Sequence, residues 1–185
     1  MSHPLFDLSG RVALVSGAAQ GVGRAMSLAF AEVGADLLLA DLNEEGARQT
    51  ATEIEAMGRR AIVARCDVSD PEQIRAMFGT LDQEFGRIDV LANVAGGGVA
   101  LGPPEETDLD AVGASMQSLV IGRFCACQEA GRRMLAAGKG SIINIVSIAG
   151  LTALGRGHTP YSMAMGGVAQ MTRELSTEWA SRGVR

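Results

Sequence analysis

Short apolar runs alternate along the chain with longer stretches in which apolar residues recur every three or four positions. The first run, Val12–Ser16, contains no charged residue, a composition typical of a strand covered on both faces. The stretch at 21–33 that follows has apolar side chains spaced as on one face of a helix. The same alternation continues to the end of the chain. We predict further strands at 37–40, 61–64, 88–92 and 141–146, and further helices at 44–57, from Pro71 onward, at 109–137 and at 161–181.

Five strands separated by helices predict a doubly wound parallel sheet, because a strand joined through a helix to a parallel neighbour takes a right-handed crossover. We therefore expect an α/β, Rossmann-like fold with helices on both faces of the sheet. The chain has 185 residues and neither a linker nor an internal repeat, so we expect residues 1–185 to form a single domain. Hydrophobic residues make up 47% of the chain and charged residues 20%, which fits a globular domain.

The overall charge and the cysteines narrow the possible partners and the compartment. The formal net charge is −5 and aromatic residues make up 4%, which argues against binding to nucleic acid or to an anionic membrane surface. No apolar run approaches the ~20 residues of a membrane span, and the beginning of the chain lacks the pattern of a secretion signal. Cys66, Cys125 and Cys127 have no metal-ligand spacing and indicate thiols in a reducing compartment. We therefore expect a cytoplasmic protein with no metal, nucleic-acid or membrane partner.

Three glycines, Gly17, Gly21 and Gly23, directly follow the first predicted strand and lead into the first predicted helix. Glycines at this spacing allow a sharp turn that brings backbone N–H groups and a helix N-terminus against a pyrophosphate. We expect these glycines, together with Gln20 and Val22, to bind the phosphates of a dinucleotide. The alternative interpretation is a strand-to-helix turn that needs glycine only for its positive φ angles.

Polar residues also end the next three predicted strands. Asp41 closes the second strand eighteen residues after Gly23, near the ~20 expected for a carboxylate that accepts both hydroxyls of an adenosine ribose. Such a carboxylate repels the 2′-phosphate of NADP, and no Lys or Arg follows at once, so we expect NAD rather than NADP. The alternative for Asp41 is a solvated loop acid. Asp67 and Asn93 end the third and fourth strands, and parallel strands bring all these sites to one edge of the sheet.

Together these residues resemble the short-chain dehydrogenase/reductase family, and the resemblance extends over nearly the whole chain. Its motifs are the glycine turn, Asn93-Val-Ala-Gly96, Asp67-Val68, the strand segment that ends in Ser147, and the segment 161–168 that begins with Tyr161. The resemblance implies an NAD-dependent oxidoreductase that transfers a hydride between nicotinamide and a small secondary alcohol or ketone. It further implies cofactor contacts, besides the glycine turn and Asp41, from Asp67, Val68, Asn93, Ala95, Gly96 and Tyr161.

The resemblance also assigns the proton transfer. It implies that Tyr161 is the catalytic acid or base and that Ser147 donates a hydrogen bond that positions the substrate oxygen. The two residues lie fourteen positions apart, where the family has thirteen, and the glycine-rich loop between them can absorb one extra residue. Histidine suits proton transfer near neutral pH, but His158 is more simply interpreted as a loop residue.

Two positions depart from the family pattern. Met165 stands four residues after Tyr161, where the family has a lysine that lowers the phenol pKa and holds the nicotinamide ribose. Leu119 stands three residues before Gly122, where the family has an asparagine that holds a water in the proton path. An alternative function is therefore a catalytically impaired dinucleotide-binding or partner subunit of the same fold. A flavodoxin-like or signalling domain would show the same alternation, but the sequence lacks the acidic cluster or lysine-containing phosphate loop of such proteins.

The family pattern continues with a sixth strand, a substrate lid and a seventh strand after the position of Arg185. We therefore expect a C-terminally truncated family member whose fifth strand is an edge. We expect the loop 96–104 and the following C-terminal region to form most of the substrate pocket. In the family the helix corresponding to 109–137 packs between subunits, so we expect a homodimer or homotetramer. Apolar residues that support this on the same helix are Met116, Leu119, Val120, Phe124, Cys127 and Met134.

Overall fold

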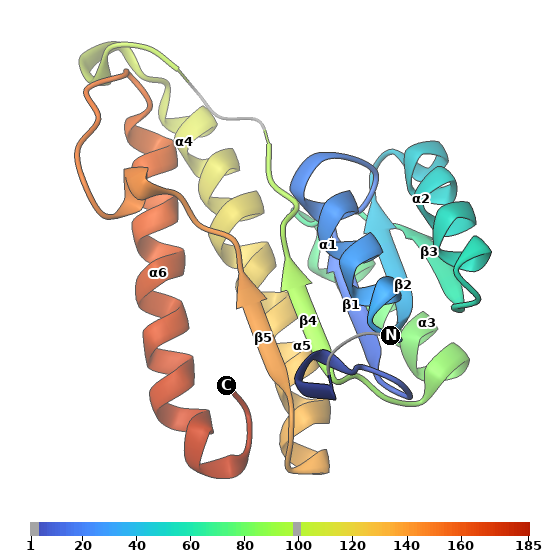
Figure 1. The fold of residues 1–185 in the computed structure, drawn as a ribbon. Coiled ribbons are helices and arrows are strands. Elements are labelled where there is room, and N and C mark those ends of the chain that lie inside the picture. Colours follow the sequence, from blue (N-terminus) through green and yellow to red (C-terminus); the bar gives the residue numbers. More distant parts are fainter. Residues whose placement is uncertain (1–3, 98–100) are drawn as a thin grey trace.

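The computed structural model describes residues 4–97 and 101–185. Its strands are β1 (Val12–Ser16), β2 (Asp36–Asp41), β3 (Ala61–Arg65), β4 (Val90–Asn93) and β5 (Ser141–Asn144). All five pair in parallel in one sheet with the order β3-β2-β1-β4-β5 (Figure 1). The strand order reverses direction between β1 and β4, where a doubly wound sheet opens a crevice for ligands. The predicted α/β, doubly wound fold is confirmed.

Helices cover both faces of this sheet. They are α1 (Gly21–Glu32), α2 (Glu44–Ala56), α3 (Pro71–Phe85), α4 (Leu109–Met116), α5 (Gly122–Ala137) and α6 (Thr159–Trp179). One apolar cluster joins α1 and α2 to one face, and a second joins α3 and α5 to the other. In Figure 1, α6 lies alongside β5, at the opposite end of the sheet from β3. Within the described ranges, no helix has the length and apolar content to cross a membrane.

The buried strand β1 explains why the sheet needs helices on both sides. All five of its residues are buried. Val12 and Leu14 belong to the cluster with α3 and α5, whereas Ala13 and Val15 belong to the cluster with α1 and α2. Successive side chains of a strand point to opposite faces. An uninterrupted apolar run is therefore what a strand between two helix layers requires.

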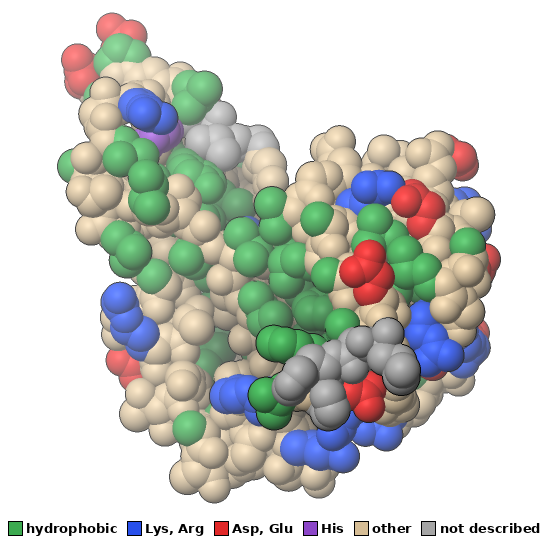
Figure 2. Space-filling model, viewed as in Figure 1, with side chains coloured by type: hydrophobic (Ala, Val, Ile, Leu, Met, Phe, Trp, Pro, Cys, Tyr) green, Lys and Arg blue, Asp and Glu red, His purple; other side chains and the backbone are tan. Residues whose placement is uncertain are grey.

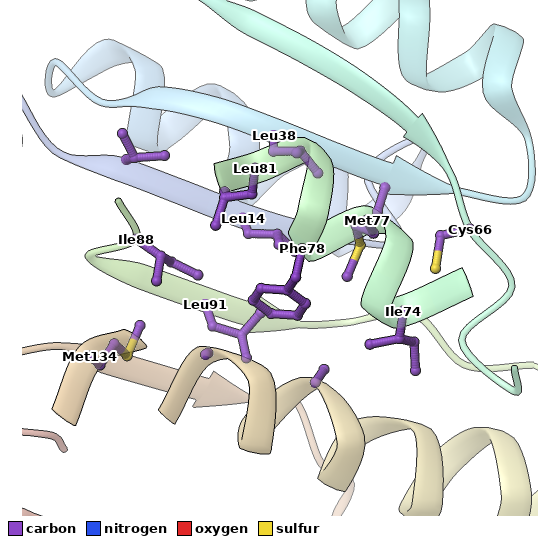
Figure 3. Packing of buried hydrophobic residues seen from close by; sticks show 14 of the residues in the cluster. Leu14, Leu38, Cys66, Ile74, Met77, Phe78, Leu81, Ile88, Leu91 and Met134 are labelled. Atoms are coloured by element: carbon purple, nitrogen blue, oxygen red, sulfur yellow. The ribbon is translucent and has the colours of Figure 1, made fainter. Parts of the chain in front are cut away.

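Figure 3 shows the cluster on the α3 and α5 face. Phe78 of α3 lies against Leu91 of β4, and Leu14 of β1 lies above them. Met134 of α5 closes the opposite side of the cluster. These four side chains are all fully buried. Truncating a buried phenylalanine such as Phe78 to alanine typically lowers the free energy of unfolding by about 3–5 kcal/mol. Packing on this face therefore stabilises the strands that carry the site.

The ends of α3 follow the signals in its sequence. The Asp70 carboxylate accepts hydrogen bonds from the backbone N–H of Glu72 at 2.9 Å and caps the helix. Pro71 occupies the first turn, where its missing N–H has no intrahelical partner to lose. The helix ends at Gly86, whose φ of 65° lies in the left-handed region that favours glycine.

The predicted helix at 109–137 is interrupted, which corrects the expectation of one continuous helix. A π-helical segment, Gln117–Ile121, separates α4 from α5. The interruption coincides with close approach to the loop after β3, because a Cβ on Gly122 would lie 1.7 Å from the Val68 carbonyl oxygen. Gln117 Nε2 also donates to the Ser69 carbonyl at 3.0 Å. π turns of this kind often lie at functional sites.

The residues after α6 return to the sheet beside β5. Val184 forms a parallel bridge with Gly140. The Ile142 N–H donates to the Arg185 carbonyl at 2.7 Å, and the Arg185 N–H donates to the Gly140 carbonyl at 3.2 Å. The first half of β5 is therefore paired on both sides, which corrects the expectation of a bare edge along the whole strand. β5 also ends at Asn144, two residues earlier than predicted.

Candidate active site

The carboxyl ends of the strands open into a cleft of about 630 Å³, within the size range of ligand pockets. Figure 2 shows the molecule hollowed at this edge, between the α4 and α6 end and the β1 to β3 side. Most of the predicted cofactor residues line the cleft: Gly17, Gln20, Val22, Gly23, Asp41, Asp67, Val68, Ala95 and Gly96. Of the remaining predicted site residues, Gly21, Asn93, Ser147 and Tyr161 do not line it.

Close backbone contacts fix the glycine turn. Gly17 has a φ of +78°, and a Cβ there would lie 2.8 Å from the Ala95 nitrogen. A Cβ on Gly23 would lie 2.0 Å from the Gly17 carbonyl oxygen, although its φ is an ordinary helical one. Gly21 differs, because it has open space around it and a φ of +55°. The turn therefore needs glycine for close approach at two positions as well as for positive φ, and the N-terminus of α1 lies at the cleft.

Two backbone hydrogen bonds hold Asp41 at the end of β2. The Ala19 N–H donates to Oδ2 and the Asn43 N–H donates to Oδ1, both at 2.9 Å. These bonds place the carboxylate beside the glycine turn and leave further lone pairs free for ligand hydroxyls. The register partner of Asp41 in β3 is Arg65, an exposed cation. This neighbour on another strand was not predicted, because no cation directly follows Asp41 in the sequence.

Hydrogen bonds also fix the conformation of the loop between β3 and α3. Asp67 Oδ1 accepts hydrogen bonds from the Ser69 N–H at 2.8 Å and the Ser69 hydroxyl at 2.7 Å. The Asp67 N–H donates to Gln73 Oε1 at 2.9 Å. Gln117, which lines the cleft from the π-helical segment, braces the same loop through the Ser69 carbonyl. Gln117 was not predicted as a site residue, because a glutamine in a helical pattern carries no distinguishing signal.

The side chain of Asn93 lies inside the fold. It is 2% exposed. Its Nδ2 donates to Asn144 Oδ1 at 2.9 Å and to Cys127 Sγ at 3.4 Å, which ties β4 to β5 and α5. The neighbouring residues Ala95 and Gly96 line the cleft in its place. The Asn93 side chain therefore supports the loop that carries these two residues.

Tyr161 and Ser147 lie on the α6 and β5 side. Tyr161 stands half-buried in the first turn of α6, with the ring of His158 edge-on at a centroid distance of 6.0 Å. The Ser147 hydroxyl accepts from the Ala149 N–H at 3.2 Å and begins the 3-10 helix Ile148–Gly150. This short helix packs directly on α6, because a Cβ on Gly150 would lie 2.5 Å from the carbonyl carbon of Met165.

A second cavity of about 960 Å³ opens beside α6. Its walls come from Gly102 to Pro104, from residues 149–159, and from Ser162 and Met163 of α6. The Gly102 N–H donates to the Gly157 carbonyl at 2.8 Å, so the loops after β4 and β5 meet here. Three residues of the predicted substrate loop, 98–100, lie outside the described residues.

An apolar cluster occupies the position where the family pattern has its lysine and asparagine. Leu119 and Met165 are 2% and 1% exposed, and they pack together with Ala164 and Val168. Tyr161 packs against the edge of this cluster. Neither a charge nor an N–H donor comes from the side chains at these two positions, so any polar support for the phenol has to come from elsewhere.

Arg123 is a buried cation between the two sides of the site. It is 5% exposed. Its Nη1 donates to the Ile145 carbonyl, its Nη2 donates to the Ala95 carbonyl at 3.2 Å, and its Nε has no partner in the described part of the chain. Burial lowers the pKa of Arg123, while the charges of Tyr161 and Cys127 act to raise it. Arg123 was not predicted as a site residue, because an arginine in a helix is usually exposed.

A doubly wound parallel sheet, a glycine turn after β1 and a carboxylate at the end of β2 together define a dinucleotide-binding protein. The family model for short chain dehydrogenases matches residues 11–185, and the chain belongs to this family.

Relatives and solved structures agree with this assignment. The chain is 41% identical over 181 residues to D-threitol dehydrogenase of Mycolicibacterium smegmatis, with 97% of this chain and 68% of that protein covered. A short-chain type dehydrogenase/reductase from Mycobacterium marinum matches with a TM-score of 0.93 and 32% identity, over 98% of this chain and 74% of that one. The crystal structure of NAD+-bound xylitol dehydrogenase matches with a TM-score of 0.92 and 28% identity, over 96% and 68%. The protein is therefore an oxidoreductase of the short-chain dehydrogenase family.

The residues present fit the nicotinamide dinucleotide that this family binds. The glycine turn provides a cradle that a Cβ at Gly17 or Gly23 would fill. The Asp41 carboxylate stands at the end of the next strand with both oxygens oriented by backbone donors. A cradle and an oriented acceptor at this spacing match a pyrophosphate and an adenosine ribose.

Proposed function

We propose that this protein is an NAD-dependent oxidoreductase that transfers a hydride between nicotinamide and a secondary alcohol or ketone. The observation that carries the proposal is the single cleft that brings the glycine turn, Asp41, and the Asp67-Val68 loop together. NAD is favoured over NADP because the fixed Asp41 carboxylate would repel a 2′-phosphate.

Each part of the cleft would hold one part of the cofactor. The backbone of the glycine turn would bind the pyrophosphate, and Asp41 would accept the hydroxyls of the adenosine ribose. Asp67 and Val68 would bracket the adenine, and Ala95 and Gly96 would line the path toward the nicotinamide. When bound, the nicotinamide ring accepts or donates the hydride.

Tyr161 would transfer the proton. During oxidation the substrate O–H bond breaks, its proton passes to the Tyr161 phenolate, and the carbon–oxygen bond becomes a carbonyl. During reduction the phenol returns that proton to the carbonyl oxygen. Ser147 would donate a hydrogen bond to the same oxygen, which requires its hydroxyl to keep only an acceptor role toward the Ala149 N–H.

Calorimetric titration with NADH and, separately, NADPH tests the cofactor proposal. Turnover with a panel of secondary alcohols tests the reaction. Threitol and xylitol come first in the panel, because the matched relative and the matched structure are named for dehydrogenation of these compounds. Tyr161→Phe should lower turnover by about 10²–10⁴-fold and affect NADH binding far less, because the phenol is only one of the predicted cofactor contacts. Turnover unaffected by this substitution would reject Tyr161 as the acid or base.

The second candidate is a catalytically impaired dinucleotide-binding or partner subunit. The apolar cluster of Leu119 and Met165 favours it, because these side chains cannot relay a proton or place a charge beside Tyr161. This candidate predicts NADH binding without turnover in the wild-type protein. A gain of turnover in Met165→Lys with Leu119→Asn would then assign the loss to these two positions.

We also propose a homodimer or homotetramer that works in the cytoplasm. Most of the apolar residues considered for a subunit contact pack within the chain, including Leu119, Cys127 and Met134. Ile121 and Phe124 remain exposed on the same helical stretch and support a contact there. The three cysteines are free and buried, which suits a reducing compartment. Sedimentation as a monomer at micromolar concentration would reject the oligomer.

A further inference from the structure

We propose that Gln117 is a specificity-determining residue of the cofactor cleft, whose side-chain oxygen accepts a hydrogen bond from the exocyclic amine of adenine. The inference rests on the proposed function, since it assigns a role in the cleft proposed for the dinucleotide. Gln117 lies outside the glycine turn and the Asp67-Val68 motif, and it is the first residue of the π-helical segment Gln117–Ile121.

The π-helical segment packs directly on the loop that is proposed to bracket the adenine. Directly after the segment, a Cβ on Gly122 would lie 1.7 Å from the Val68 carbonyl oxygen. At its beginning, Gln117 Nε2 donates to the Ser69 carbonyl at 3.0 Å. Gln117, Val68 and Ser69 all line the cleft. The Gln117 side chain therefore stands next to the residues that are proposed to hold the base.

The bond to Ser69 fixes which way the Gln117 amide faces. A backbone carbonyl can only accept a hydrogen bond, so the atom that meets it is the amide nitrogen Nε2. The amide oxygen Oε1 then lies on the other branch of the planar group. Among the residues that the structure describes, Oε1 has no donor. This half-buried side chain therefore keeps an acceptor available to a ligand in the cleft.

Most neighbouring polar groups in this part of the cleft already have protein partners. Asp67 Oδ1 accepts from both the N–H and the hydroxyl of Ser69. The hydroxyl of Ser118 donates to the Ser115 carbonyl at 3.4 Å. The exocyclic amine of adenine carries two N–H donors, so it can donate to Gln117 and to the second carboxylate oxygen of Asp67 together. Gln117 thus contributes an uncharged acceptor beside a charged one.

An amide oxygen at this place distinguishes adenine from hypoxanthine. Adenine has an amine at C6, whereas hypoxanthine has a carbonyl oxygen there, so two acceptors would face each other. An acceptor left without its donor in a confined site lowers affinity, and a site built to bind an N–H group rejects an analogue that lacks it. We therefore expect the protein to prefer NADH to reduced nicotinamide hypoxanthine dinucleotide, which differs from NADH only in its base.

Calorimetric titration of the whole chain with each of these two dinucleotides measures the preference directly. We expect the wild-type protein to bind NADH about tenfold more tightly or better. Gln117→Met keeps the length of the side chain and removes the amide. It should reduce the preference for NADH by about five- to tenfold, because the lost acceptor serves the amine of adenine and has no donor to meet on hypoxanthine C6.

Gln73→Met is the matched control. Gln73 braces the same loop, since its Oε1 accepts from the Asp67 N–H at 2.9 Å, but its side chain does not line the cleft. Its replacement should weaken the binding of both dinucleotides by the same factor and leave the preference unchanged. The comparison of the two glutamines therefore separates recognition of the base from support of the loop.

A preference in Gln117→Met equal to that of the wild type overturns the proposal, whatever the absolute affinities are. Equal affinity of the wild type for both dinucleotides overturns it without any variant, which covers the case in which Gln117→Met does not fold. Turnover does not enter these titrations. A Gln117-dependent preference without turnover on any alcohol of the panel rejects the proposed reaction alone, whereas Tyr161-dependent turnover with equal affinity for both bases rejects only the role of Gln117. Failure of both dinucleotides to bind rejects the cofactor site and the role of Gln117 together.

Discussion

On the β1 and β2 side, the glycine turn and the hydrogen-bonded Asp41 carboxylate line the cleft, whereas on the α6 side an apolar cluster packs against Tyr161. The first side matches its sequence pattern at each glycine and at Asp41. The second side keeps Tyr161 and Ser147 but has Met165 and Leu119 where polar groups are expected. We therefore expect cofactor binding and proton transfer to be separable properties of this protein. The first rests on backbone geometry, and the second depends on how the interior supports one side chain.

The largest effect is expected from Gly23→Ala on the cofactor side. A Cβ there would lie 2.0 Å from the Gly17 carbonyl oxygen, so the turn has to move. Overpacking of this severity costs about 3 kcal/mol, and we expect NADH binding to weaken by about 100-fold or more. Calorimetric titration measures the change.

Gly79→Ala is the matched control for that substitution. Gly79 lies inside α3, and no atom comes within 4 Å of the position that its Cβ would take. Its replacement should leave NADH affinity unchanged and raise the stability of α3 by about 0.5–1 kcal/mol. If Gly23→Ala binds NADH as tightly as Gly79→Ala, the close approach of α1 to the turn does not shape the cofactor site.

On the α6 side, Met165→Lys should destabilise the fold. The side chain at this position is 1% exposed and is surrounded by apolar residues. An ammonium group without a carboxylate partner in such a place costs about 3 kcal/mol or more of unfolding free energy. Urea unfolding followed by the fluorescence of Trp179 measures the loss. Met165→Leu should cost less than about 1.5 kcal/mol, and an equal loss in both variants would show that shape rather than charge matters there.

The fold follows from the sequence because its signals are local and repeated. β1 is a continuous apolar run, and both of its faces are covered as that run predicts. The glycine turn and Asp41 were predicted as cofactor residues for the same reason, since that prediction depends on spacing along one strand-turn-helix unit. The interrupted helix was not predicted, because apolar spacing continues through Gln117–Ile121 and does not distinguish a π turn from an α turn.

The side-chain positions that the sequence did not predict depend on hydrogen bonds between residues far apart in the chain. The side chain of Asn93 binds Asn144, and the guanidinium of Arg123 binds the carbonyls of Ala95 and Ile145. Each of these pairs joins residues that are more than twenty positions apart. Whether a polar side chain faces a cleft or the interior depends on such partners, and no periodic pattern records them.

Asp89 lies at the amino ends of the strands, away from the cleft, and offers a stability test that should leave cofactor binding unchanged. Asp89 accepts hydrogen bonds from the Val12 N–H at 3.0 Å, from Arg11 at 3.0 Å, and from Arg87 at 2.6 Å. Burial raises the pKa of Asp89, but these hydrogen bonds outweigh it and hold the pKa below that of a free aspartate. We expect Asp89→Asn to lose about 2 kcal/mol of unfolding free energy at pH 7 with NADH affinity unchanged.

The pH dependence of that loss has a definite sign. A carboxyl group with a lowered pKa in the folded state stabilises the fold above its unfolded pKa of about 3.9. That contribution disappears as the pH falls through the lower pKa of the folded state, so wild type and Asp89→Asn should converge in acid. Glu72→Gln removes an exposed ion pair with Arg75 and should cost less than about 0.5 kcal/mol. A pH-independent difference between wild type and Asp89→Asn would contradict the ionic explanation.

The smallest effect is expected at Asp41, which lines the cofactor side of the cleft. Asp41→Asn removes the charge and replaces one acceptor oxygen with a donor, so one of the bonds from Ala19 and Asn43 is lost. We expect NADH affinity to fall about tenfold and NADPH affinity to rise, since Arg65 is the register partner of this position and would face the 2′-phosphate. Adding Arg65→Gln should abolish the gain for NADPH while leaving the loss for NADH.

Asp36→Asn is the control, because Asp36 lies at the other end of the same strand and accepts a hydrogen bond from the Arg60 N–H at 2.9 Å. If Asp36→Asn changes the preference between NADH and NADPH as much as Asp41→Asn does, the preference reflects total charge rather than a carboxylate placed at the ribose.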